Sequence, residues 1–295
     1  MPARMDAGAA IEVQGLTKRY GSHVAVDGVS LTVDRSEVFG ILGPNGAGKT
    51  TTLEMIEGLR EPDAGDVTVL GHSVWPDPRS IQTLIGVQLQ TTSLFDMLTA
   101  RELLVLFARF YLRADADERA ESSLAQVGLE SKGADYAKNL SGGQQQRLAI
   151  ALALVHDPEI VFLDEPTTGL DPQARRNLWD VIRSINQEHG KTVVLTTHYL
   201  EEAEELCDRV AIMDEARIVA LDTPAGLIEA LDADARVSYT DSGGDHAVYV
   251  RDVQATVLEV LERARASGET VQNLSVKGAD LEDVFLSLTG REYRE

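Results

Sequence analysis

The most specific spacing of chemically active residues in this chain lies in a glycine-rich loop, which has the sequence Gly43-Pro44-Asn45-Gly46-Ala47-Gly48-Lys49-Thr50. It fits the pattern G-x-x-x-x-G-K-[ST] of phosphate-binding loops. The glycines let backbone N–H groups surround phosphate oxygens, Lys49 adds a positive charge, and the Thr50 hydroxyl suits Mg²⁺. The loop lies between a short apolar run, Val38–Leu42, and a segment that we predict as helix, Thr51–Leu59. Because a helix N-terminus attracts anions, residues Gly43–Thr51 are predicted to bind the phosphates of a nucleotide.

Two adjacent carboxylates, Asp164 and Glu165, follow a second apolar run, Ile160–Leu163. Ligands of α/β sheets bind at the carboxyl ends of strands, which is where these groups would lie. We expect Asp164 to hold Mg²⁺ through water, because Mg²⁺ keeps much of its hydration shell. We expect Glu165 to act as general base on the attacking water. An apolar strand ending in Asp-Glu is a weak signal alone, and the phosphate loop upstream gives it weight.

A third string consists of Leu140 and the residues Ser141, Gly142, Gly143 and Gln144, and it precedes a predicted helix, Gln144–Val155. A serine followed by glycines is an ordinary helix start. The same hydroxyl, glycine N–H groups and helix N-terminus can also bind a second phosphate. This string closely resembles the signature sequence of the ATP-binding-cassette (ABC) ATPases. The resemblance extends over about residues 11–223.

The resemblance implies roles for two residues that composition and spacing leave unassigned. Tyr20 is similar in position to the aromatic residue that stacks on adenine, although a tyrosine packed in a turn is the other interpretation. Gln90 is similar to the glutamine that reaches Mg²⁺ and the reacting water. Leu89 stands where the family commonly has proline, and Gln88 competes for the same role.

Two further positions acquire roles in the same way. His198 follows the β-rich run Thr192–Thr197 and resembles the histidine that contacts the γ-phosphate. Asp171 resembles the loop residue that contacts the opposite subunit, whereas an Asp-Pro pair is also an ordinary helix start. The remaining histidines are interpreted as structural, and they are His23, His72, His156, His189 and His246.

The family resemblance implies a head-to-tail homodimer that holds two ATP molecules. Each ATP would lie between Gly43–Thr51 of one copy and Ser141–Gln144 of the other. Closure without ligand would leave backbone N–H groups unpaired, so ATP would join the subunits and hydrolysis would weaken the dimer. All the consensus catalytic positions are present, which predicts two equivalent, competent sites with ATP and Mg²⁺ as ligands.

The composition fits a protein of the cytoplasm. The 295 residues include 48 acidic against 27 basic side chains, a formal net charge of −21, which disfavours nucleic-acid binding. No apolar run approaches the ~18–20 residues of a membrane span. Residues Met1–Ala10 lack the apolar core of a secretory signal. The single cysteine, Cys207, excludes an internal disulfide and fits a reducing compartment.

The elements that must position the site alternate between strand and helix for about 220 residues, which indicates a mostly parallel sheet with flanking helices. We therefore expect an α/β P-loop NTPase core at residues 11–223. It should contain an antiparallel β subdomain at Ile11–Val33, with turns at Tyr20-Gly21 and Asp27-Gly28, and a helical subdomain at about residues 91–155. The helices expected after the first are Arg101–Leu112, Ala116–Val127, Gln144–Val155 and Pro172–Glu188.

Residues 224–295 form a predicted small α+β domain with the order ββαβα. A five-residue loop, Asp241–Asp245, connects its first two strands, and an apolar stripe at Leu281–Leu288 marks its last helix. The stretch Ala279–Gly290 resembles the ending of bacterial export ATPases of the daunorubicin-resistance type. This implies a separate six-span permease of the second export class (ABC-2) and cargoes such as drugs, antibiotics, polysaccharides or lipids. The run Gln144–Arg147 departs from the Met/Lys version of some drug-resistance members.

These predictions combine into one function, the ATP-hydrolysing subunit of a membrane exporter, peripheral on the inner face of the plasma membrane. The segment after Gln90, with Leu94, Phe95 and Met97, would supply a groove for a helix of the permease, unless these side chains pack locally. An ABC ATPase that acts on a soluble macromolecular assembly is the alternative. Only one phosphate loop is present, whereas translation-type members usually carry two cassettes in one chain. An importer ATPase is a further alternative, against which the tail weighs.

Overall fold

The computed structural model describes residues 8–89, 94–111, 113–231 and 235–290. The chain divides into two compact units, of which the first ends at Leu221 and the second begins at Asp222. Within these described ranges, none of the helices combines the length and the apolar character that crossing a membrane requires.

The first unit begins with a four-stranded sheet in the order β2-β1-β4-β5. Its strands are β1 (Ile11–Tyr20), β2 (His23–Val33), β4 (Ala64–Val69) and β5 (His72–Ser73). The predicted antiparallel pair and the turn after Tyr20 are confirmed, since β1 pairs with β2 and Tyr20 lies opposite His23. The predicted turn at Asp27-Gly28 is wrong, because β2 continues through it. Gly28 adopts a φ of 66°, and the register of the pair shifts near it, so this glycine accommodates an irregularity inside a long strand.

A six-stranded sheet in the order β10-β9-β3-β8-β7-β6 forms the centre of the first unit. Its strands are β3 (Val38–Leu42), β6 (Ile85–Gln88), β7 (Ile160–Asp164), β8 (Thr192–Thr197), β9 (Arg209–Asp214) and β10 (Arg217–Asp222). Strand β3 runs parallel to β8 and β9, and β7 runs parallel to β8 and β6. Every residue of β3, β7 and β8 is buried, as expected for strands covered on both faces. The loops that follow these parallel strands therefore emerge at one edge of the sheet.

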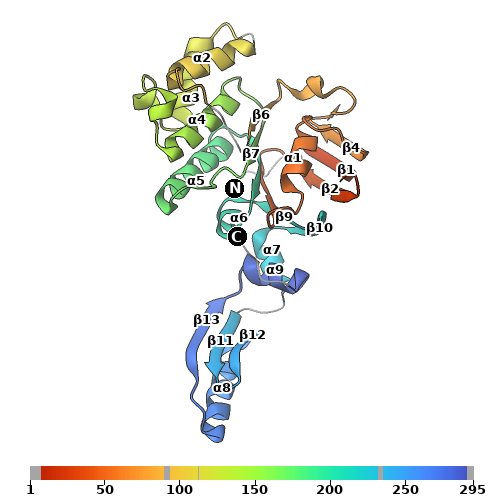
Figure 1. The fold of residues 1–295 in the computed structure, drawn as a ribbon, viewed down its shortest axis with the longest axis vertical. Coiled ribbons are helices and arrows are strands. Elements are labelled where there is room, and N and C mark those ends of the chain that lie inside the picture. Colours follow the sequence, from red (N-terminus) through yellow and green to blue (C-terminus); the bar gives the residue numbers. More distant parts are fainter. Residues whose placement is uncertain (1–7, 90–93, 112, 232–234, 291–295) are drawn as a thin grey trace. The chain divides into compact units, whose positions relative to one another are not determined.

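Helices surround this sheet (Figure 1). Those of the first unit are α1 (Lys49–Ile56), α2 (Ala100–Phe110), α3 (Ala116–Gln126), α4 (Gly142–Leu154), α5 (Pro172–Gln187) and α6 (Leu200–Leu206), with short 3₁₀ turns at Pro78–Ile81, Glu130–Lys132 and Ala137–Asn139. Helix α1 packs against strands of both sheets. Helix α5 packs on β8, and α6 packs on β8 and β3. Helices α2, α3 and α4 pack on one another at the end of the unit away from the four-stranded sheet (Figure 1). The predicted fold class, a mostly parallel sheet with flanking helices and an antiparallel β part, is confirmed.

The second unit contains a three-stranded antiparallel sheet in the order β12-β11-β13. Its elements are α7 (Pro224–Glu229), β11 (Ala235–Asp241), β12 (Gly244–Val250), α8 (Val253–Ser267), β13 (Gln272–Gly278) and α9 (Leu281–Thr289). The order ββαβα matches the prediction, but it is preceded by α7, a helix that was not predicted. Thr223 caps α7 by accepting a hydrogen bond from Gly226 N, and Pro224 occupies its first position. A Thr-Pro pair is a typical helix start, so the signal was present in the sequence.

Candidate functional site

The glycine-rich loop connects buried β3 to α1, and close packing fixes its shape. Gly48 has a φ of 103°, which disfavours other residues, and a Cβ atom there would lie 2.4 Å from the carbonyl oxygen of Ala25. A Cβ atom at Gly43 would lie 2.3 Å from the carbonyl oxygen of Met213. The backbone N–H of Gly43 donates to Thr197 at the end of β8. Glycine is therefore required at both ends of the loop by the surrounding backbone.

Lys49, the first residue of α1, turns its side chain back into this loop. Its ammonium group donates to the carbonyl oxygens of Gly43, at 2.8 Å, and Pro44, at 3.2 Å. It also lies 3.3 Å from Oε1 of Glu165. Burial lowers the pKa of Lys49, although the negative charge of Glu165 acts in the opposite direction. The lysine is thus held as a buried cation whose present partners are oxygen atoms of its own chain.

Asp164, the last residue of β7, accepts hydrogen bonds from two threonine hydroxyl groups. One is Thr50 Oγ1, at 3.2 Å, and the other is Thr196 Oγ1 on the neighbouring strand β8. Burial raises the pKa of Asp164, and both hydrogen bonds oppose this shift. Among the described residues, no three side chains of the types His, Cys, Asp and Glu gather into a metal-binding group. A hydroxyl and a carboxylate in contact are nevertheless hard oxygen ligands that suit Mg²⁺, which takes few protein ligands and keeps its waters.

Glu165 has a left-handed backbone conformation, with a φ of 47°, which is uncommon for a residue other than glycine. Its N–H donates to Thr196 Oγ1, and its carboxylate accepts from Thr168 Oγ1 at 3.2 Å. Nδ1 of buried His198 lies 3.1 Å from Oε2 of Glu165, as a close contact rather than an aligned hydrogen bond. Burial favours a raised pKa for Glu165, but the positive charge of Lys49 and the contact with the His198 ring act in the opposite direction and outweigh burial, so the pKa is lowered. The carboxyl group is therefore ionised at neutral pH.

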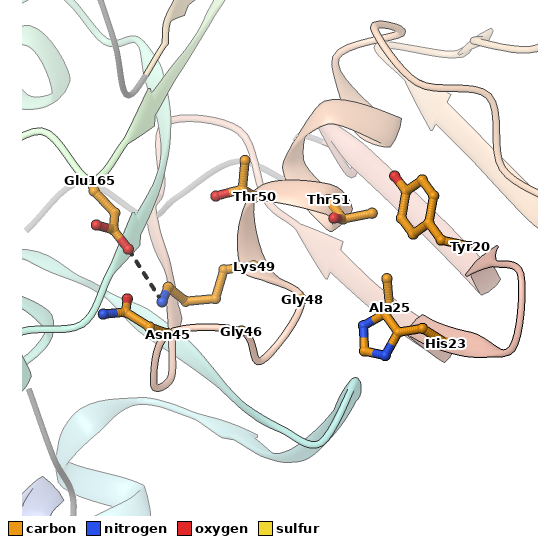
Figure 2. A pocket seen from close by; sticks show the side chains of 10 residues that line it. All are labelled: Tyr20, His23, Ala25, Asn45, Gly46, Gly48, Lys49, Thr50, Thr51 and Glu165. Carbon is orange, nitrogen blue, oxygen red and sulfur yellow. Dashed lines mark ion pairs between the residues drawn. The ribbon is translucent and has the colours of Figure 1, made fainter.

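A pocket of about 330 Å³ opens beside these groups (Figure 2). Its walls are formed by Tyr20, His23, Ala25, Asn45, Gly46, Gly48, Lys49, Thr50, Thr51 and Glu165. Figure 2 shows Glu165 and Lys49 at one end and Tyr20 at the other, with the loop between them. Tyr20 is 44% exposed, and the guanidinium of Arg60 lies 5.5 Å from the centre of its ring. The pocket thus joins a cationic phosphate-sized end to an aromatic surface.

Some predicted site residues lie outside the pocket lining but next to it or beneath it. Asp164 contacts Thr50, and His198 contacts Glu165. Ala47 is buried, and its N–H donates to Pro44 within the loop. The parallel strand order explains why residues that are far apart in sequence meet at one edge of the sheet.

The string Ser141–Gln144 does not line this pocket. It forms the start of α4, where Ser141 and Gly142 are exposed and Gly143 and Gln144 are half-buried. Ser141 Oγ accepts from Gln144 N, and the Gln144 side chain accepts from Ser141 N. Asp171 is also exposed and outside the pocket, and its carboxylate caps α5 by accepting from Gln173 N and Ala174 N. Within a single chain, these two predicted contact points therefore remain separate from the nucleotide-sized pocket.

Gln90 lies outside the described residues. Gln88, its competitor in the sequence analysis, is buried at the end of β6 and donates from its side chain to the carbonyl oxygen of Leu89. It does not line the pocket beside Lys49 but a second groove of the first unit. Leu94 and Phe95 line that same groove, whereas Met97 is exposed and does not.

His23 and Ala25 line the pocket, although neither was predicted as a site residue from the sequence. His23 lies directly opposite Tyr20 in the β1–β2 hairpin. Tyr20 was predicted to contact the ligand. Because His23 pairs with Tyr20 across the hairpin, it lies beside the same ligand position. The hairpin spacing was therefore a signal that could have found His23.

Comparisons with known proteins give one family. The model of the ABC transporter family matches residues 26–168. Over 302 residues the chain is 43% identical to "Nod factor export ATP-binding protein I" of Burkholderia pseudomallei, a match that covers 96% of this chain and 98% of the relative. It is 35% identical to "Linearmycin resistance ATP-binding protein LnrL" of Bacillus subtilis, with 97% of this chain and 100% of the relative covered.

Solved structures agree with the sequence matches. A structure of the ATP-binding subunit of an ABC transporter superposes with a TM-score of 0.67 at 30% identity, and the match covers 76% of this chain and 93% of that chain. The dimeric ATP-binding cassette MJ0796, in a post-hydrolysis state bound to ADP and Pi, superposes with a TM-score of 0.65 at 30% identity. That match covers 72% of this chain and 98% of the other.

Proposed function

Since the chain belongs to the ABC transporter family and is an ATPase, we propose that it powers a membrane exporter of the ABC-2 type through ATP-driven head-to-tail dimerisation. One observation carries the proposal: the pocket beside Lys49 is lined by the phosphate loop and Tyr20, while Ser141–Gln144 of the same chain lies elsewhere on the surface. In the proposed dimer, Ser141–Gln144 of a second copy of the chain closes the pocket beside Lys49. Two relatives that match nearly the whole chain are named for Nod factor export and linearmycin resistance, which supports the transport assignment.

In this proposal ATP lies with its adenine on Tyr20 and its phosphates in the loop Gly43–Thr51. Lys49 moves its N–H donors from the carbonyl oxygens of the loop to the phosphate oxygens. Asn45 and Gly46 line the pocket on the same side and present the loop backbone to the phosphates. Binding thereby replaces intramolecular partners of a buried cation with the stronger charge of the phosphates.

Thr50 and Asp164 would hold Mg²⁺, since their oxygen atoms already lie in contact and suit that ion. Gln90 is proposed as a further contact to the ion and the reacting water. When bound, Mg²⁺ would neutralise charge on the β- and γ-phosphates. Thr196 orients the Asp164 carboxylate and the backbone of Glu165 together, because its hydroxyl bonds both.

Glu165 is the proposed general base. Its lowered pKa keeps the carboxylate ionised and able to accept a proton from water. His198, in contact with Glu165, is proposed to bind the γ-phosphate, and Asp171 to contact the opposite subunit. Hydrolysis removes the contacts that hold Ser141–Gln144 of the second copy, so the dimer opens.

The permease is proposed to be a separate six-span membrane protein, which places the chain in the cytoplasm on the inner face of the plasma membrane. We propose the ABC domain at residues 11–223, with the helical subdomain at about 91–155 and a C-terminal domain at 224–295. The docking surface for the permease is the groove that contains Leu94 and Phe95. Leu89 and Phe95, which line this groove, are 48% and 57% exposed, and such exposure of large apolar residues supports an interaction role.

The test is capture of the partner by a trapped dimer. Tagged Glu165→Gln protein is purified from its native host in detergent, with ATP and Mg²⁺, and the proteins that accompany it are identified at defined stoichiometry. The proposal expects one polytopic membrane protein, and expects Lys49→Ala, which cannot hold the phosphates, to release it from the trapped state. Recovery of a ribosome or another soluble assembly alone would overturn the transport assignment while leaving the ATPase chemistry intact.

A further inference from the structure

A groove of about 450 Å³ in the first unit is lined by the end of α1, by β6, and by helices α2 and α4. Most of its wall is apolar, with side chains such as Leu94, Leu103, Phe107 and Leu152. The proposed function assigns this groove to the permease. An inference about which partner helix the groove recognises therefore rests on that proposed function.

Two buried polar groups interrupt this apolar wall. Glu57, which caps the C-terminal end of α1, is only 4% exposed, and its Oε1 has no hydrogen-bond partner among the described residues. Gln88 is 2% exposed, and its Oε1 likewise lacks a partner in the described part of the chain. Buried oxygen acceptors are seldom left without a donor, because the water that they lose must be replaced.

The wall itself supplies no charge to compensate Glu57. The described lining residues include no lysine, arginine or histidine. Burial raises the pKa of Glu57 to about 8, and the negative charges of Asp164 and Glu54 act in the same direction. The free chain therefore keeps this carboxyl group mostly protonated at neutral pH, and a cation that entered the groove would stabilise its ionised form.

Arginine matches this pair of acceptors better than other basic groups. Its guanidinium carries five N–H donors in a plane and is more weakly hydrated than an ammonium group, so it can enter an apolar groove and serve a carboxylate and an amide oxygen together. The C-terminal end of α1 adds a partial negative charge beside Glu57. A neutral donor would satisfy one oxygen but would leave the charged form of Glu57 uncompensated.

We propose that Glu57 and Gln88 recognise an arginine side chain that projects from an otherwise apolar helix of the membrane partner. Glu57 is thereby a specificity-determining residue of the docking groove, distinct from the ATP site. The apolar wall binds the helix, and the carboxylate selects the helix that brings a guanidinium.

The first experiment measures binding of two synthetic helical peptides, each about 16 residues long with leucines on one face. They differ at one central position on the leucine face, which is arginine in one and citrulline, its neutral isostere, in the other. The full chain should bind the arginine peptide at least about tenfold more tightly. Glu57→Gln should remove this preference, and Glu54→Gln, a carboxyl change on the same helix, should keep it. Equal binding of the two peptides by the wild-type chain would overturn the proposal.

The second experiment uses the membrane protein captured with the trapped dimer. Glu57→Arg should lose that protein, and exchange of one arginine of its cytoplasmic segments for glutamate should restore the complex. Retention of the membrane protein by Glu57→Arg at wild-type affinity would overturn the recognition while leaving the export function in place. Discrimination between the peptides without any captured membrane protein would instead support the recognition and contradict the export function. Tryptophan fluorescence confirms folding of each variant, since Trp75 and Trp179 both belong to the first unit.

Discussion

The ammonium group of Lys49 lies 3.3 Å from the carboxylate of Glu165, and both side chains are almost completely buried. The residue proposed to bind phosphate and the residue proposed to activate water are therefore each other's counter-ions before any nucleotide is present. In the proposed function, phosphate would compete for Lys49 and free Glu165 from this pairing, which would leave Glu165 next to His198. The pairing would thus link nucleotide binding in the pocket to release of the proposed general base.

Glu165→Gln should bind ATP at least as tightly as the wild-type chain, because Lys49 loses an intramolecular competitor for its charge. Turnover should fall by about 10²- to 10⁴-fold, the usual contribution of a general base. Fluorescent-nucleotide titration and phosphate release measure the two effects. Glu201→Gln, an exposed carboxyl on α6, is the matched control. Unchanged hydrolysis by Glu165→Gln would remove the general-base assignment.

Gly48→Ala should weaken ATP binding by more than about tenfold. The added Cβ meets the carbonyl oxygen of Ala25 at 2.4 Å, so the phosphate loop must move. Gly71→Ala is the control for backbone strain without a clash. Gly71 also has a positive φ, 81°, but a Cβ atom there would meet no other atom within 4 Å. Nucleotide titration of both variants checks the prediction, which fails if they bind equally well.

Ser141→Ala should leave nucleotide binding to the single chain intact and should reduce both ATP-dependent dimerisation and turnover. The side chain lies outside the pocket of its own chain, and its loss removes a helix cap that contributes about 1 kcal/mol to stability. Thr99→Ala removes an equivalent capping box at α2 and serves as the control. Light scattering with ATP and phosphate release are the measurements. An equal loss of turnover in both variants would mean that the cap, not the interface, explains the effect.

The raised pKa of Glu57 predicts that the stability of the first unit depends on pH. Its pKa of about 8 in the folded chain is above that of an unfolded glutamate, so the folded state binds the extra proton between about pH 4.5 and 8. The free energy of unfolding therefore loses a contribution as the pH rises through this range, by up to about 5 kcal/mol. Glu57→Gln, which does not titrate, should gain stability over the wild-type chain at pH 8 and show little difference at pH 5.

Urea unfolding followed by tryptophan fluorescence at several pH values measures this difference in the first unit. Glu54→Gln is the control, since Glu54 lies on the same helix but forms an ion pair with Arg60. A difference between Glu57→Gln and the wild-type chain that stays constant with pH would contradict the raised pKa.

In the second unit, Asp283→Ala should lower stability by about 2–3 kcal/mol. Asp283 is 1% exposed and accepts hydrogen bonds from Arg236 and from the hydroxyl of Tyr249, which the variant leaves without this partner. Hydrogen exchange of the amides in β11 and β12, measured on the full chain, should accelerate. Glu262→Ala, on the exposed side of α8, should leave the exchange unchanged.

Much of the fold was predictable because its signals are local. The buried runs Val38–Leu42 and Thr192–Thr197 are strands with the predicted bounds, and the start of α5 at Pro172 agrees with its Asp-Pro signal. The family prediction is confirmed by relatives that match nearly the whole chain. The failures involved weak local signals. They are a glycine inside β2, the short helix α7, and the predicted five-residue loop Asp241–Asp245, where β11 instead extends to Asp241 and β12 begins at Gly244.

By itself the sequence determined most of the segments that become strands and helices and the position of the phosphate-loop pattern, since hydrophobic period, turn chemistry and this pattern are properties of neighbouring residues. Only the tertiary structure decided that Thr196 bonds both Asp164 and Glu165, that His198 contacts Glu165, and that Glu57 shares a groove with Gln88. It also decided that Ser141 lies outside the pocket of its own chain. These relations depend on the order of parallel strands in the sheet. That order is set by which buried faces pack together across long connections, so no short stretch of sequence carries it.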